Sequence, residues 1–249
     1  MPPWQRNELF MMVQEHKQLP PVPALDARLL AAAAYVRRGA LAADIGCDHG
    51  KLAVYLARTG TARHVVAVDI RPAPLARAQV LVEKHGCSAG VECRLGDGLC
   101  ALKPCEADDI VIAGVSGVTA AAILGAAQPF WQPGKRFVFV PATRRAELRG
   151  WLWGHGFSLL DETPVQAAGR FYTVMCAEYT GQVHTPALLE CAVGLSAKPT
   201  GASAGYLRHV AKLVRKYTLG VPQAEQAPFV QLAGQVDALA ERCEREAQK

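Results

Sequence analysis

The feature that most constrains the fold is the alternation of short apolar segments with segments of helical periodicity. The apolar segments cover residues 41–47, 64–70, 91–95, 109–114 and 136–140. A helical segment precedes the first of them at 25–39, and others lie at 51–59, 72–85, 118–127 and 145–155. Buried parallel strands are apolar on both faces, and strand–helix alternation is typical of a doubly wound sheet. We therefore predict a Rossmann-like α/β domain.

The last third of the chain departs from this alternation. Segments 157–165 and 170–179 are strand-like and are separated only by QAAG, which predicts an antiparallel hairpin that closes the parallel sheet. After Tyr179, residues 206–217 and 232–243 have helical spacing, and the second has the alternating steps of a helix pair. We predict an N-terminal leader (1–23), an α/β domain (24–180) and a small C-terminal helical, coiled-coil-like appendage (181–249).

Composition limits the setting in which the chain works. Apolar residues make up 51% and the formal charge is +5, a mild excess compatible with an anionic partner such as RNA. The eight cysteines contain no C-x-x-C pair, so we expect no metal site. We find no secretion-signal pattern at the start and no apolar run long enough for a membrane. We expect reduced thiols, no membrane association and a cytoplasmic location.

The strongest functional motif is DIGCDHG, residues 44–50, at the carboxyl end of the first predicted strand. Gly46 permits a tight turn that brings backbone N–H groups close to a ligand. A dinucleotide-binding loop would have glycine and a small residue where this chain has Asp48 and His49. A carboxylate repels a diphosphate but attracts the ammonium group of S-adenosylmethionine (SAM), so the loop favours SAM over NAD.

Three further motifs follow later strands. Asp69 ends its strand 23 residues after Gly46, near the spacing at which an acid reaches the ribose of an adenosine cofactor; the alternative is a helix cap. GDGL, residues 96–99, places Asp97 for the adenine amine, and an ordinary turn is equally consistent with it. AGVSG, residues 113–117, leaves room for a planar base. The predicted cofactor-binding residues are Asp44, Gly46, Asp48, His49, Asp69, Ile70, Gly96, Asp97, Gly98, Ala113 and Gly114.

These motifs together resemble the bacterial tRNA (adenine(22)-N1)-methyltransferase family, often called TrmK. The likeness runs from about Leu25 to Tyr179 through LDARLLAAAAYVRRGALAADIGCDHG, GDGL, IAGVSG and PATRRAELRGWLWGHGFSLLDET. It implies a class I methyltransferase sheet with a helical appendage, SAM as cofactor and tRNA as substrate. The chain differs from the family in having Lys51 for an aromatic residue, Val115-Ser116 for Met-Gly, and Val140 and Ala142 for the Gln and Asn that flank Pro141.

Methyl transfer to adenine N1 mainly requires alignment, and a carboxylate near the ring would stabilise the positive charge that develops on it. We take Asp48, with His49 beside it, as the candidate catalytic group; holding the ammonium group of SAM is an equally good role for Asp48. For RNA we expect contacts from Pro141, Arg144, Arg145 and Arg149 after the fifth strand and from Arg208, Lys212 and Arg215 on the tail helix, although the tail row also reads as a solvated face.

Other functions stay open at this point. A SAM-binding RNA methyltransferase homologue with a different target or without catalysis is the main alternative, because both polar neighbours of Pro141 are replaced. An NAD(P)-dependent dehydrogenase is supported only by the glycine turn and Asp69. The polar loop after the first strand argues against a pure interaction module.

Overall fold

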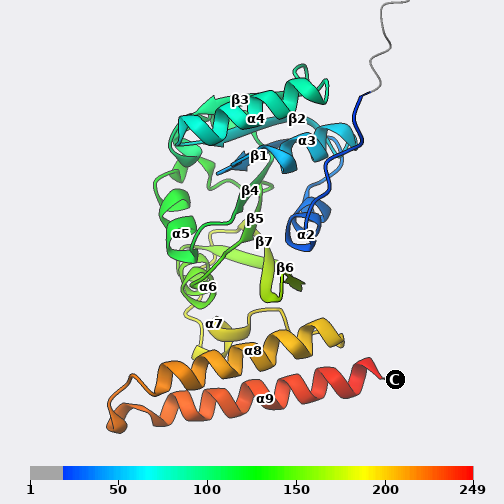
Figure 1. Cartoon of the computed structure of the whole chain (residues 1–249). Helices are drawn as coiled ribbons and strands as arrows, with labels where there is room; N and C mark the ends of the chain where they lie inside the picture. The colour runs from blue at the N-terminus through cyan, green and yellow to red at the C-terminus, as the bar shows by residue number, and fades with distance from the viewer. Residues whose placement is uncertain (1–18, 249) are drawn as a thin grey trace, which may run out of the picture.

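The computed structural model describes residues 19–248, so most of the predicted leader lies outside the described residues. Seven strands form one sheet of order β3-β2-β1-β4-β5-β7-β6 (Figure 1). The first five strands pair in parallel, and β7 runs antiparallel to both β5 and β6. Their bounds are Ala40–Ile45 (β1), Ala62–Asp69 (β2), Val91–Leu95 (β3), Asp109–Ala113 (β4), Arg136–Val140 (β5), Phe157–Ala167 (β6) and Arg170–Tyr179 (β7). The Rossmann-like sheet with an antiparallel closing hairpin is confirmed.

Helices cover both faces of this sheet. The bounds are Ala27–Tyr35 (α2), Lys51–Arg58 (α3), Pro72–Lys84 (α4), Gly117–Gly125 (α5) and Arg145–Gly154 (α6). Side chains alternate between the faces along each strand, so neighbouring positions of β1 enter different cores: Ala42 packs with α2, α3 and α4, and Ala43 packs with α5 and α6. Figure 1 shows α2 and α3 on one side of the sheet and α5 and α6 on the other.

Local sequence explains where the elements begin and end. Helix α2 starts after Asp26, whose carboxylate accepts from the N–H groups of Arg28 and Leu29, and α5 starts after Ser116, whose hydroxyl accepts from the N–H of Thr119. Strand β1 stops at Ile45 because Gly46 has a φ of 76°. The β6–β7 hairpin turns at Ala168 and Gly169, which both have positive φ, as a tight two-residue turn requires.

The chain after Tyr179 is helical, as predicted. Helices α7 (Leu188–Val193), α8 (Gly201–Thr218) and α9 (Ala227–Ala247) follow the sheet, and α8 and α9 form a long hairpin beneath its β6–β7 end (Figure 1). The hairpin has its own core, which includes Leu207, Val210 and Val236. Short 3₁₀ turns lie at Gly98–Ala101, Pro104–Glu106, Gln128–Phe130 and Gln223–Glu225. Within residues 19–248, none of the helices combines the length and the apolar character that a membrane crossing requires.

A buried ion pair joins the hairpin to the sheet. Arg149 of α6 and Glu162 of β6 are both 0% exposed, and the guanidinium also donates to the carbonyl of Ala192, at 2.8 Å, and to the hydroxyl of Tyr206, at 3.0 Å. The expectation that Arg149 contacts RNA is therefore wrong. The sequence places a third arginine in a basic run, but helical periodicity turns this one inward, where a carboxylate, backbone carbonyls and a tyrosine hydroxyl accept its hydrogen bonds.

Candidate functional site

The predicted ligand residues meet at one edge of the sheet because parallel strands present all their carboxyl ends there. The register aligns Ile45 of β1 with Val68 of β2 and Ile112 of β4, and it aligns Ala113 with Val140 of β5. Strand order reverses between β1 and β4, the point at which open α/β sheets bind their ligands. The loops after β1, β2, β3 and β4 therefore converge there.

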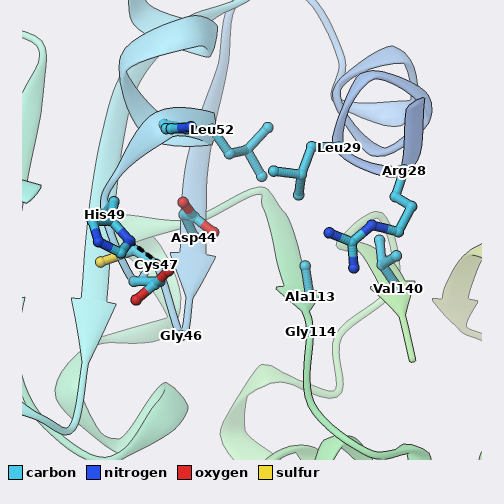
Figure 2. Close-up of a pocket in the computed structure, with 12 residues that line it drawn as sticks. Arg28, Leu29, Asp44, Gly46, Cys47, His49, Leu52, Ala113, Gly114 and Val140 are labelled. Atoms are coloured by element: carbon cyan, nitrogen blue, oxygen red, sulfur yellow. Dashed lines mark hydrogen bonds and ion pairs between the residues drawn. The ribbon is translucent and has the colours of Figure 1, made fainter. Parts of the chain in front are cut away.

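A cavity of about 220 Å³ lies directly above β1 and β4. Figure 2 shows its two walls: Arg28 and Leu29 reach in from helix α2, opposite Asp44 and the loop that carries His49. Its lining residues are Arg28, Leu29, Asp44, Gly46, Cys47, Asp48, His49, Lys51, Leu52, Ala113, Gly114 and Val140. We call this the inner cavity.

A second cavity of about 570 Å³ adjoins the first and shares Gly46, Asp48, Ala113 and Gly114 with it. Its remaining lining residues come from the ends of β1 to β4, the loops that follow them and helix α5: Ile45, Val68, Asp69, Ile70, Arg71, Gly96, Asp97, Gly98, Val115, Thr119 and Ile123. Ile70 is 60% exposed, which leaves an apolar surface available to a flat ligand. We call this the outer cavity, and the two cavities together contain all eleven residues predicted to bind the cofactor.

Asp69 anchors the loop that separates the cavities. Its side chain is 3% exposed, and it accepts from the backbone N–H of Asp48 at 3.1 Å and from that of Arg71 at 2.9 Å. The backbone N–H groups of Gly46 and Cys47 both donate to the carbonyl of Val68. Asp69 does not cap the following helix through its side chain, because the cap residue of α4 is Arg71, which makes no side-chain capping bond.

Asp48 lies at the junction of the cavities in a left-handed backbone conformation, with a φ of 49°. Its carboxylate is 2.6 Å from Nδ1 of His49 and 4.0 Å from the Arg71 guanidinium. The side chain is more than half exposed, so water screens these ion pairs. Asp48 thus faces both cavities with a negative charge that a cationic ligand can approach.

Asp44, like Asp69, is a buried acid of the site. It is 3% exposed, and its Oδ2 atom makes no hydrogen bond within the described chain. Burial raises the pKa of Asp44 to about 7, against a favourable backbone hydrogen bond from Ala53. A buried carboxylate oxygen without a partner, at the wall of a cavity, is unusual in folded proteins and suits a ligand that donates to it.

Arg28 is a site residue that the sequence argument missed. It lies on α2, far along the sequence from the carboxyl end of any strand. It reaches the inner cavity because α2 packs against the sheet (Figure 2). Its guanidinium bonds to Asp26 and lies 4.7 Å from the centre of the Tyr172 ring. The LDARLL segment that carries it belongs to the stretch of family resemblance, and this is the only signal in the sequence that could have indicated it.

The residues predicted to contact RNA fall into two groups. Arg144 and Arg145 lie just beyond Pro141, beside the β6–β7 turn. Arg208 and Arg215 form ion pairs with Glu244 and Asp237 of α9, so each already has an acidic partner on the opposite helix. Lys212 lies between them on α8 and is exposed.

The open sheet, the antiparallel β7 beside β5 and the paired cavities at the switch point define a class I methyltransferase architecture rather than a dehydrogenase one. Comparison with known sequences agrees with this assignment. The chain belongs to the methyltransferase domain family, whose sequence model matches residues 25–175.

Comparison with individual proteins shows a more specific similarity. The tRNA (adenine(22)-N(1))-methyltransferase of Bacillus subtilis strain 168 is 36% identical over 154 residues, which span 62% of this chain and 65% of the relative. The crystal structure of B. subtilis TrmK superposes with a TM-score of 0.74 at 26% identity, covering 89% of this chain and 99% of that one. A Streptococcus pneumoniae protein in complex with S-adenosyl-L-methionine superposes with a TM-score of 0.77 at 25% identity, covering 86% and 100%. These matches confirm the family resemblance seen in the sequence.

Proposed function

We propose that this protein is a SAM-dependent tRNA methyltransferase that methylates N1 of adenine 22 and acts in the cytoplasm. The observation that carries the proposal is the pair of joined cavities, with the acids Asp44, Asp48 and Asp69 around their junction. One cavity is large enough for a nucleoside and the other has room for a short charged chain. The relatives at 25–36% identity with that printed activity or with bound SAM support the same conclusion.

The residues around the cavities fit SAM. The adenosine part would lie in the outer cavity, with Asp69 at the ribose hydroxyls, Asp97 at the adenine amine and Ile70 against the ring. A Cβ at Gly46 would contact only the Ala113 carbonyl, at 3.9 Å, and one at Gly114 would contact nothing within 4 Å. Side chains at these two glycines would therefore occupy cavity space that the ligand needs.

The amino acid end of SAM carries two opposite charges, and the inner cavity offers a partner for each. The unpartnered Oδ2 of Asp44 and the exposed carboxylate of Asp48 can accept from the ammonium group. Arg28, which faces them from α2, can bind the carboxylate. A diphosphate would instead meet the exposed carboxylate of Asp48 on the loop, and for this reason the site disfavours NAD.

Bound SAM supplies an electrophilic methyl group, and the protein must align adenine N1 with it. Asp48 lines both cavities, so its carboxylate would stabilise positive charge on a ring that is methylated at their junction. His49 at 2.6 Å holds the orientation of that carboxylate. The small residues Ala113 and Gly114 leave the approach to the junction open for a planar base.

The test is methyl transfer to unmodified tRNA transcripts that carry adenine or guanine at position 22, followed by nucleoside mass analysis. We expect 1-methyladenosine only from the adenine transcript. The Asp48→Asn variant separates the two roles of that residue: lost turnover with unchanged SAM affinity supports charge stabilisation of the ring, whereas lost affinity assigns Asp48 to the ammonium group. Absence of 1-methyladenosine in every transcript would contradict the proposed function.

A second candidate, an RNA methyltransferase with another target or no activity, is favoured by one observation. Val140 lines the inner cavity, and Ala142 lies beyond Pro141. Neither position therefore offers a side-chain amide to a target base. If methylated nucleosides other than 1-methyladenosine form in bulk unmodified tRNA, or if SAM binds and no RNA is methylated, this candidate replaces the first.

A further inference from the structure

A third cavity, of about 670 Å³, lies between the methyltransferase domain and the C-terminal hairpin. Three segments that are distant in the sequence form it: the loop after β5, the β6–β7 turn and one face of α8. Its lining residues are Ala142, Thr143, Arg144, Arg145, Gly169, Arg170, Phe171, Tyr172, His209 and Leu213. We call it the basic groove.

The charge of the groove has one sign. Three arginines line it and no acid does. Arg145 donates to the carbonyl of Phe171 at 2.7 Å, while its buried Nε makes no hydrogen bond within the described chain. Arg144 pairs with Glu147, which lies outside the lining, and Arg170 is exposed at the hairpin turn. The groove therefore presents guanidinium groups to whatever enters it, and its natural occupant is a polyanion.

Aromatic rings accompany these charges. Phe171 and His209 lie 5.5 Å apart between ring centres with a 32° tilt, although they come from β7 and α8. Burial, together with Arg145 and Lys212, lowers the pKa of His209, which favours the neutral ring. Ring faces interleaved with arginine are the surfaces on which unpaired bases stack, whereas an acidic peptide needs only the charge.

The basic groove lies next to the inner cavity. Val140 lines the inner cavity, and the chain reaches the groove two residues later at Ala142. Arg28 of the inner cavity lies over the ring of Tyr172, which lines the groove. An RNA strand that places one base at the junction of the inner and outer cavities therefore reaches the groove with its neighbouring nucleotides.

We propose that the basic groove binds the nucleotides next to the methylated base, with phosphates on Arg144 and Arg170 and a base stacked on Phe171 and His209. This inference rests on the proposed function. An enzyme that modifies the ring nitrogen of a base in folded RNA must remove that base from its stack, and the displaced strand needs a second point of attachment. The groove supplies it, and it gives the C-terminal hairpin a direct part in substrate binding.

Three variants test the groove: Arg170→Glu removes a phosphate contact, Phe171→Leu removes the ring but keeps apolar volume, and Arg63→Glu is the control. Arg63 is an exposed arginine of β2 near its amino end, away from the cavities, and its reversal changes the net charge equally. Steady-state methylation of unmodified tRNA, tRNA affinity at several salt concentrations and S-adenosylhomocysteine (SAH) affinity are measured for each.

We expect Arg170→Glu to raise the KM for tRNA by on the order of 10-fold and to reduce the salt slope by about one, because one phosphate contact is lost. Phe171→Leu should weaken tRNA binding by on the order of 10-fold with little change in salt slope, because stacking depends weakly on salt. SAH affinity should stay unchanged in all three, and Arg63→Glu should match the wild type.

The failures of the two proposals can be told apart. A wild-type protein that neither binds nor methylates tRNA overturns the proposed function itself. An active wild type with Arg170→Glu and Phe171→Leu indistinguishable from Arg63→Glu overturns the groove alone. Competition by polyglutamate as effective as that by unmodified tRNA would assign the groove to an acidic peptide instead.

Discussion

Asp44 shows at the scale of one residue how this site is prepared for a cationic ligand. An acid buried without a full set of hydrogen bonds opposes folding in its charged form, and its pKa of about 7 expresses that cost. The unfolded chain ionises the same group near 3.8. Between these two pKa values, the folded protein therefore keeps a proton on Asp44 that the unfolded chain releases. The stability that this group contributes falls as pH rises through that window.

Replacing Asp44 with Asn should consequently stabilise the ligand-free protein at pH 8 and matter little at pH 4. The gain is at most on the order of 4 kcal/mol, since each unit of pKa corresponds to about 1.4 kcal/mol. Urea unfolding of both proteins across pH 4–8 measures the difference. Equal differences at both ends of the range would show that Asp44 is ionised throughout and that its burial is compensated.

Arg28 makes a second prediction at this scale. Because it faces the inner cavity, Arg28→Ala should weaken SAH binding by about 10- to 100-fold, the usual value of charge-assisted hydrogen bonds. Methylthioadenosine lacks the amino acid end, so its affinity should not change. Equal weakening of both ligands in calorimetry would mean that Arg28 supports the fold of the cavity and does not bind the carboxylate.

At the scale of elements, the joint between β6 and the C-terminal hairpin depends on the buried pair Arg149 and Glu162. Glu162→Gln leaves a buried guanidinium without its counter-charge and should lower the free energy of unfolding by about 3–5 kcal/mol. Glu244→Gln, which breaks the exposed pair with Arg208, should lower the free energy of unfolding far less, because water screens exposed charges. Similar losses in chemical unfolding of the two variants would refute a special role for the buried joint.

The sequence predicted the positions of helices and strands better than it predicted which side chains are in contact. The β3 segment 91–95 and the β7 segment 170–179 match the structure at both ends, because apolar periodicity and turn residues are local signals. The roles of Arg28, Arg149 and His209 depend on which helix packs where, and no local pattern encodes that. A basic run such as Arg144, Arg145 and Arg149 reads as one surface until packing turns one member inward.

In the whole molecule, the buried Arg149–Glu162 pair couples the stability of the α/β domain to that of the C-terminal helical appendage. Removing residues 181–249 takes away the Cys191 and Ala192 carbonyls and the Tyr206 hydroxyl, and it strands the Arg149–Glu162 pair at a new surface. We expect such a truncation to unfold well below the full chain in a thermal melt. A truncated protein with an unchanged melting temperature would show that the hairpin is energetically separate.

The cavities are likewise a property of the whole fold, since α2, five strand ends and the loops between them contribute to them. The strand-end residues that the sequence motifs indicated line these cavities, because parallel topology places them at one edge of the sheet. The charge balance of the site became visible only when α2 brought Arg28 opposite Asp44. Under the proposed function, the full arrangement would recognise a zwitterionic nucleoside, with acidic side chains at its ammonium group and ribose and Arg28 at its carboxylate.

Titration calorimetry with SAH tests that recognition most directly, with NADH as the competing ligand and Asp69→Asn as the matched variant. We predict one SAH site per chain, at least 10-fold weaker binding in Asp69→Asn, and no heat with NADH. Binding of NADH with none of SAH, on folded protein, would contradict the account.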